Sequence, residues 1–243
     1  MKKIFHSASS RGAANHGWLQ AKHSFSFANY YDSERVQFGA LRVLNDDIIS
    51  PGMGFGTHPH DNMEIITIPL KGTLEHKDSM DNIGIVEADE IQVMSAGSGV
   101  YHSEYNKNKD QSLSLLQIWV FPNKKNVTPR YDQKNIKDLK KSNSFYPIVT
   151  PNQNGPAMWI HQDAWFHLGE FDKETKIKRI QKRKTLENRS DDELGTILKR
   201  YDTYMETTKP VLDFYSKNPN FHEIDGSTEI EQITNKIDTF INV

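Results

Sequence analysis

Short apolar runs separated by turn-forming residues fill the first half of the chain. The run from Ile65 to Ile68 contains three isoleucines and one threonine, and such β-branched runs are typical of a buried strand. Similar runs occupy residues 84–86, 91–94 and 113–120. Turn-forming residues separate the runs at Gly72, Asp81-Asn82, Ala88-Asp89-Glu90 and Gly97-Ser98-Gly99. Many short strands at this spacing predict a mainly β fold, a barrel or a sandwich, over residues 1–132.

The periodicity changes near residue 178 from that of strands to that of helices. Ser190 and Glu193 form a capping-box pattern, which marks a helix start. Apolar residues then recur at helical spacing, at Leu194, Ile197, Leu198, Tyr201 and Met205. A second helical stripe contains Ile230, Ile233, Ile237 and Phe240. The sequence therefore predicts a C-terminal α-helical tail over residues 179–243.

A polar stretch rich in lysine and proline, residues 123–156, separates the strands from the tail and is typical of a crossing between domains. Strand-like sequence returns at 157–171 and then stops. We therefore expect three parts: a β domain at 1–132, a linker with a partial second β domain at 133–178, and the helical tail at 179–243.

Bulk composition narrows the class of protein. The 243 residues suffice for one large or two small domains, and the net charge of −2 creates no field that would recruit nucleic acid or an anionic membrane. The absence of cysteine excludes disulfides, thiolate metal sites and cysteine nucleophiles. No apolar run reaches the roughly 18 residues of a membrane span, and residues 1–10 lack the core of a signal peptide. We expect a cytoplasmic protein whose opening residues form a strand.

Two polar pairs carry the candidate chemistry. His58 and His60 flank a proline, and His102 and Glu104 flank a serine about forty residues later. Side chains two residues apart on a strand point to the same face. Two such strands side by side would bring three imidazoles and one carboxylate together. That donor set suits a divalent transition metal such as iron, nickel, copper, zinc or manganese.

The sequence around these pairs resembles the cupin motifs. Gly52, His58, His60, Glu64 and Gly72 fit the first motif, with one extra residue before the closing glycine. Gly97, His102 and Asn106 fit the second, although its proline is absent and two residues are inserted. These departures match one subfamily, pirin. Resemblance to pirin is dense between residues 2 and 132, at 15–18, 23–31, 41–47, 54–60, 75–80, 94–106, 117–120 and 128–131, and the opening of a second pirin cupin extends it to about residue 175.

The pirin resemblance implies a double-cupin fold whose N-terminal cupin, a β-barrel of jelly-roll type, binds a metal. The implied ligands are His58, His60, His102 and Glu104, and the implied metal is Fe2+, with Ni, Cu, Mn, Zn and Co as alternatives. The second cupin is incomplete here, which leaves a sheet edge and an apolar face. Three alternatives follow: the tail helices cover that face, the segment is loosely ordered, or a partner chain completes the sheet.

The resemblance also implies two alternative functions. Bacterial pirins resemble quercetin 2,3-dioxygenases, which implies a flavonol-like substrate and dioxygen as partners, with Glu104 accepting the hydroxyl proton as a general base. Other pirins are iron-binding redox sensors or transcriptional cofactors, which implies a protein partner. Among the other polar residues, we expect His23 and His76 to be structural and Glu64 to share the face of His60.

The tail resembles the C-terminal end of adenylate kinase over about residues 186–243. Arg189 and Arg200 would correspond to phosphate-contacting arginines of that family. The chain has no glycine-rich phosphate-binding loop ending in Gly-Lys-Ser/Thr, so the phosphates would lack their cradle of backbone amides. We expect no adenylate kinase activity.

Overall fold

A computed structural model describes residues 6–175, in which the residues up to Phe171 form one compact unit and Asp172 begins a second. The predicted helical tail and its resemblance to adenylate kinase lie outside the described residues. Within residues 6–175, no helix is long and apolar enough to cross a membrane.

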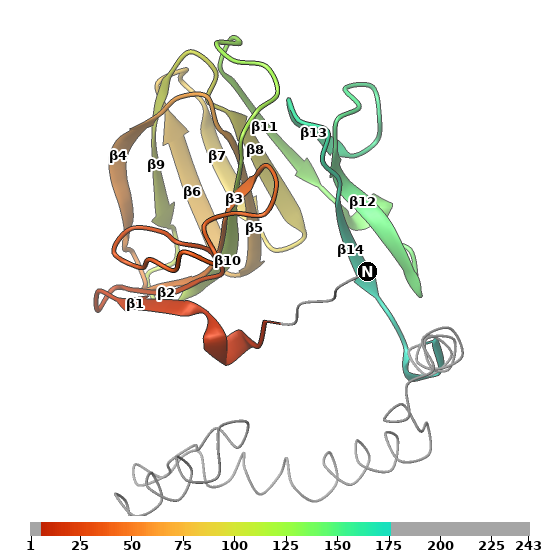
Figure 1. Cartoon of the computed structure of the whole chain (residues 1–243), viewed down its shortest axis with the longest axis horizontal. Coiled ribbons are helices and arrows are strands. Elements are labelled where there is room, and N and C mark those ends of the chain that lie inside the picture. Colours follow the sequence, from red (N-terminus) through yellow and green to blue (C-terminus); the bar gives the residue numbers. More distant parts are fainter. Residues whose placement is uncertain (1–5, 176–243) are drawn as a thin grey trace, which may run out of the picture. The chain divides into compact units, whose positions relative to one another are not determined.

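The first unit is built from strands in three sheets, which confirms the mainly β prediction (Figure 1). The seven-stranded sheet contains, in spatial order, β1 (Gly12–Asn15), β2 (Leu19–His23), β3 (Leu41–Ile49), β10 (Leu113–Val120), β5 (Glu64–Lys71), β8 (Glu90–Ser95) and β11 (Arg130–Asn135). The four-stranded sheet contains β4 (Gly54–His60), β9 (Val100–Asn106), β6 (Thr73–Asp78) and β7 (Ile83–Glu87). The three-stranded sheet contains β13 (Met158–Trp159), β12 (Ser144–Thr150) and β14 (Phe166–Glu170). Two short 3-10 helices complete the unit, η1 (Ala8–Ser10) and η2 (Lys137–Leu139).

The seven-stranded and four-stranded sheets pack face to face and enclose the first part of the core. A cluster of buried residues from both sheets joins them, formed by Leu19, Ala21, Ile49, Leu74, Val86, Leu113 and Leu115. Leu113 and Leu115 of β10 face this interior. Because successive side chains on a strand point to opposite faces, the side chains between and after them on β10 alternate between the interior and the outer face of the large sheet.

The three-stranded sheet packs on that outer face. Ile66 of β5, Val93 of β8 and Ile118 of β10 share one buried cluster with Ile148 and Met158. The central strands are thus covered on both sides. This explains why β5 is buried from Glu64 to Pro69 and why its sequence is apolar at successive positions. The three-stranded sheet therefore has one face buried within the described residues.

The predicted strands at 65–68, 84–86, 91–94 and 113–120 are confirmed as β5, β7, β8 and β10. Two expectations were wrong. Among the opening residues, Ala8–Ser10 form η1 rather than a strand. The stretch 123–156, expected to be only a crossing, contains β11 and β12, because its polar residues occupy an edge strand that pairs with β8.

We expect the three-stranded sheet to unfold together with the first two. Ile148→Ala should lower the free energy of unfolding by about 2–5 kcal/mol, because the side chain is 1% exposed and its loss leaves a cavity. Ile83→Ala removes the same atoms from a side chain that is 69% exposed. It should change the free energy of unfolding by less than about 0.5 kcal/mol. Urea unfolding followed by two spectroscopic probes measures both. A near-zero effect of Ile148→Ala would show that the outer sheet does not stabilise the barrel.

Candidate metal centre

Strands β4 and β9 bring the two polar pairs together. They pair antiparallel, with His58 directly opposite His102. The ligand atoms of His58, His60 and His102 all lie within 4.8 Å of one another, and the Nε2 atoms of His58 and His102 are 2.9 Å apart. Two nitrogens bound to one ion at about 2.0–2.1 Å each can be at most about 4.2 Å apart, so this separation permits a shared ion.

The proton on His58 is placed by its own strand. Its Nδ1 lies 2.8 Å from the carbonyl oxygen of Gly56, which accepts a hydrogen bond and so requires the proton on Nδ1. The register of β4 against β9 shifts between Phe55 and His58, in the segment that contains Gly56. The other ring nitrogen, Nε2, faces His102.

Burial keeps the other two imidazoles neutral. The pKa of His60 is lowered to about 4 by burial and by the neighbouring His102 and His58. The pKa of His102 is lowered to about 3 by burial and by His58 and His76. Neutral imidazole is the form that binds metals, and imidazoles that face one another gain from a shared cation. The donor set fits a divalent transition metal.

Glu104 lies on β9 beside the imidazoles and is held by three donors. The side chains of Gln92 and Thr67 donate hydrogen bonds to Oε1, at 2.6 and 3.2 Å, and Gln117 donates to Oε2 at 2.7 Å. Its carboxylate groups with His76 and His102, whose ligand atoms lie within 4.8 Å of it. His102 is therefore common to two groups of potential ligands.

The donors to Glu104 belong to a row of polar residues that crosses the seven-stranded sheet. Strand register places the members of the row opposite one another on six successive strands: His23, Asn45, Gln117, Thr67, Gln92 and Gln133. In an otherwise apolar interior, such a row costs stability unless its members find hydrogen-bond partners. The row therefore faces the polar residues of β9 across the barrel.

His76 lies beside this site, and its buried, hydrogen-bonded ring fits the structural role expected for it. It is fully buried on β6, its Nδ1 lies 3.4 Å from Nδ1 of His102, and its Nε2 lies 3.2 Å from a carboxylate oxygen of Asp78. Tyr131 stacks on its ring with centroids 4.5 Å apart. The sequence does indicate that His76 and Asp78 face the same side of a strand, because they lie two positions apart, as do the members of the other two pairs.

Glu64 does not share the face of His60, so that expectation was wrong. A turn with Asn62 at a φ of 45° ends β4, and Glu64 begins β5 in the opposite sheet. Its carboxylate accepts a hydrogen bond from Ser95 at 2.8 Å, and burial raises its pKa. Glu64 thus belongs to a separate buried network.

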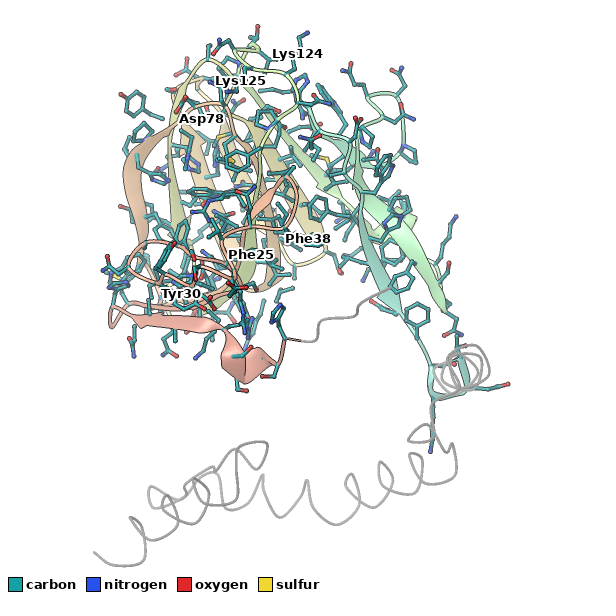
Figure 2. The ribbon with its side chains drawn as sticks, in the orientation of Figure 1. Phe25, Tyr30, Phe38, Asp78, Lys124 and Lys125 are labelled. Carbon is teal, nitrogen blue, oxygen red and sulfur yellow. The ribbon has the colours of Figure 1, made fainter. Side chains whose placement is uncertain are left out.

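A cavity of about 210 Å³ opens beside the imidazoles. Its wall includes His58 and Glu104, and it is lined further by Leu19, Ala21, His23, Phe27, Asn45, Asp47, Phe55, Gln117 and Trp119. A second cavity of about 510 Å³ shares five of these residues and continues toward Tyr30. Figure 2 shows Tyr30 near the β1 and β2 end of the molecule and Asp78 toward the opposite end. Phe27 and Phe55 line both cavities.

Four buried polar atoms of the smaller cavity have no hydrogen-bond partner among residues 6–175. They are His23 Nδ1, Asn45 Oδ1, Asp47 Oδ1 and Trp119 Nε1. Burial, together with the nearby carboxylates of Asp46 and Glu104, raises the pKa of Asp47 to about 7. Buried polar groups without partners are costly and are typical of surfaces that bind a polar ligand.

Comparisons with known proteins agree with this geometry. Residues 5–120 match the family described as Pirin. The chain is 50% identical over 156 residues to a protein of Escherichia coli K12 named quercetin 2,3-dioxygenase, and 43% identical over 154 residues to a pirin-like protein of Caulobacter vibrioides. A crystal structure of the bacterial pirin YhhW of Escherichia coli in complex with nickel(II) superposes with a TM-score of 0.62 at 48% identity, covering 66% of this chain and 68% of that one.

The similarity is confined to part of each relative. The match to the Escherichia coli dioxygenase covers 64% of this chain and 66% of the relative, so the chain spans just under two thirds of the length of that protein.

Loss of one imidazole should release the metal. We expect His58→Ala and His102→Ala to weaken Ni2+ binding by more than the roughly 10–100-fold that loss of an outer hydrogen-bond partner costs a metal site. His167→Ala, which removes an exposed imidazole of β14, should leave affinity unchanged. Elemental analysis after dialysis and a chelator competition measure both. Full metal content in His102→Ala would exclude this centre.

Asp47 should destabilise the metal-free protein at high pH. Its folded pKa lies near 7, above the unfolded value of 3.8, so the folded state holds a proton that the unfolded state has lost. Stability therefore falls as pH rises from about 4 to 7. Asp47→Asn should leave the free energy of unfolding unchanged below about pH 4. Above pH 7 it should raise the free energy of unfolding by up to about 4 kcal/mol. Urea unfolding at pH 4 and 8 measures this, with the exposed Asp110→Asn as the control of equal charge change. Equal effects at both pH values would contradict it.

Proposed function

The chain belongs to the pirin family, and on this premise we propose that it is a metal-dependent dioxygenase of the quercetin 2,3-dioxygenase type. The observation that carries the proposal is the convergence of three imidazoles on one point beside a cavity with unpartnered polar atoms. The names of its relatives support the same reaction class.

In this proposal His58, His60, His102 and Glu104 hold the metal. Imidazole and carboxylate donors suit Fe2+, and they also suit Ni, Cu, Mn, Zn and Co. The nickel(II) complex of the Escherichia coli relative supports a divalent ion without selecting iron. When bound, the metal would lower the pKa of a substrate hydroxyl and orient the substrate toward dioxygen.

Glu104 is the catalytic residue of the proposal and accepts the proton of the substrate hydroxyl. Its two oxygens carry hydrogen bonds from Gln92 and Gln117, which fix the carboxylate at the cavity wall. A carboxylate positioned in this way can act as a general base at the hydroxyl it faces.

The cavity supports a flavonol-like aromatic substrate. Phe27, Phe55 and Trp119 provide apolar and aromatic walls, and the acceptors of Asn45 and Asp47 can bind hydroxyl donors of the substrate. Dioxygen is the second substrate. An aromatic ring system too large for the 210 Å³ cavity has room in the wider cavity toward Tyr30.

The alternative function is an iron-binding redox sensor or transcriptional cofactor, and one feature of β9 favours it. Tyr101 and Tyr105 alternate with His102 and Glu104 along this strand, and their side chains are 57% and 39% exposed. A change of metal oxidation state that moves β9 would therefore alter an aromatic surface that a protein partner could bind.

Oxygen consumption with quercetin tests the enzyme. Metal-loaded protein should consume dioxygen, His58→Ala should abolish consumption together with metal, and Glu104→Gln should lower kcat by about 10²–10⁴-fold, the usual loss when a general base is removed. Glu87→Gln makes the same exchange at an exposed strand end and should leave kcat unchanged. Negligible turnover by fully loaded wild-type protein would favour the sensor.

A further inference from the structure

Two oxygens on β3 line the smaller cavity without a hydrogen-bond donor. Asn45 and Asp47 are 3% and 4% exposed, and the Oδ1 atom of each has no partner among residues 6–175. Both residues line the cavity whose wall also includes His58 and Glu104. Because they lie two positions apart on one strand, their side chains point to the same face, with Cα atoms roughly 6.8 Å apart.

The neighbours of Asp47 in the sheet have nothing to donate. Ala21 of β2 and Leu115 of β10 lie directly opposite it, and neither side chain has a polar group. A carboxyl group keeps an acceptor oxygen whether or not it carries a proton. A donor to this oxygen must therefore come from a molecule in the cavity.

The neighbours of Asn45 are polar but do not reach its oxygen. Gln117 of β10 lies opposite it, donates from Nε2 to Glu104 at 2.7 Å and accepts from Thr67 at 2.7 Å. On the other side lies His23 of β2, whose Nδ1 also has no partner among the described residues. The hydrogen bonds of the polar row thus end at Gln117, one strand spacing of about 4.8 Å before Asn45.

Two unpaired acceptors call for two separate donors. A hydroxyl group has one O–H proton, so a single hydroxyl can satisfy one of these oxygens but not both. Two hydroxyls on adjacent ring carbons present two donors at one edge of a ring. A ligand with only one of them would leave the other acceptor buried and unpaired, which costs binding free energy.

The rest of the wall fits an aromatic ring with a second polar end. Phe27 and Phe55 line the cavity, and Trp119 lies edge-on to Phe27 with ring centroids 5.3 Å apart. The Trp119 ring is also 4.9 Å from the ring of His60, so its unpartnered indole N–H belongs to the metal end of the cavity. That donor suits a carbonyl group, which flavonols carry next to the hydroxyl that would face the metal.

We propose that Asn45 and Asp47 are specificity-determining residues that bind two adjacent hydroxyls on the pendant ring of the substrate. The preferred substrate is then a flavonol with a catechol ring, whose reactive hydroxyl lies at the metal and whose catechol edge lies against β3. The position of the reactive hydroxyl rests on the proposed function, whereas the preference for the catechol can be measured without turnover.

Three flavonols that differ only in the hydroxyls of the pendant ring test the preference: quercetin has two, kaempferol one and galangin none. Calorimetric titration of Ni2+-loaded protein without dioxygen measures their dissociation constants. We expect each missing hydroxyl to raise Kd by about 10-fold, the usual effect of one lost hydrogen bond to a buried partner.

Apolar variants of similar shape assign the preference to the two residues. Asn45→Leu and Asp47→Leu should each weaken quercetin binding by about 10-fold without weakening galangin binding. Both should also raise the midpoint of urea unfolding, because each removes an unpaired buried acceptor. A purely structural role predicts the opposite shift of the midpoint. Asp46→Leu makes the same exchange on the opposite face of β3, where Asp46 pairs with Arg11, and should keep the wild-type order of affinities.

Equal affinities of wild-type protein for the three flavonols, or no binding of any of them, would overturn the proposal. So would the wild-type order of affinities in both leucine variants. Oxygen consumption by wild-type protein separates this result from the reaction. Turnover without a preference for quercetin would refute only the catechol site, and the preference without turnover would refute only the dioxygenase.

Discussion

The register of three antiparallel strands, β4, β9 and β6, is the constraint on which the site depends. It sets His58, His102 and Asp78 side by side in one row and Glu104 opposite His76 in the next. Because side chains alternate, a slip of one residue in either pairing would turn the groups of the shifted strand away from the interior. Backbone hydrogen bonding thus sets the positions of these side chains before any metal binds.

The opposite sheet provides the rigid support. Its central strands are buried on both faces, by the four-stranded sheet within the barrel and by the three-stranded sheet outside. On this support lies the polar row whose Gln92, Thr67 and Gln117 hold Glu104. Where the row continues to Asn45 and the adjacent Asp47, its acceptors have no partner within residues 6–175, and the protein bears a cost in stability there. A fold that bears such a cost beside a metal centre is consistent with a binding surface for a polar ligand.

Local spacing explains which parts of this picture the sequence could predict. The pairs of His58 with His60 and of His102 with Glu104 each lie within three residues, so strand geometry alone indicates that their side chains converge. The apolar runs that became β5, β7, β8 and β10 are likewise local patterns. The polar row could not be found in this way, because its six members lie between residues 23 and 133 and are related only through strand pairing. Glu64 was misplaced because the turn at Asn62 moves the following strand to the other sheet, and η1 was missed because residues 6–10 carry no periodic signal.

Anomalous diffraction from crystals of the metal-loaded protein, collected at the absorption edge of the bound metal, tests the central claim most directly. The account predicts one peak about 2.0–2.2 Å from Nε2 of His58 and His102 and from a ring nitrogen of His60, with a Glu104 oxygen at a similar distance. A peak between the Nδ1 atoms of His76 and His102, or no peak within about 3 Å of the three imidazoles, would contradict it.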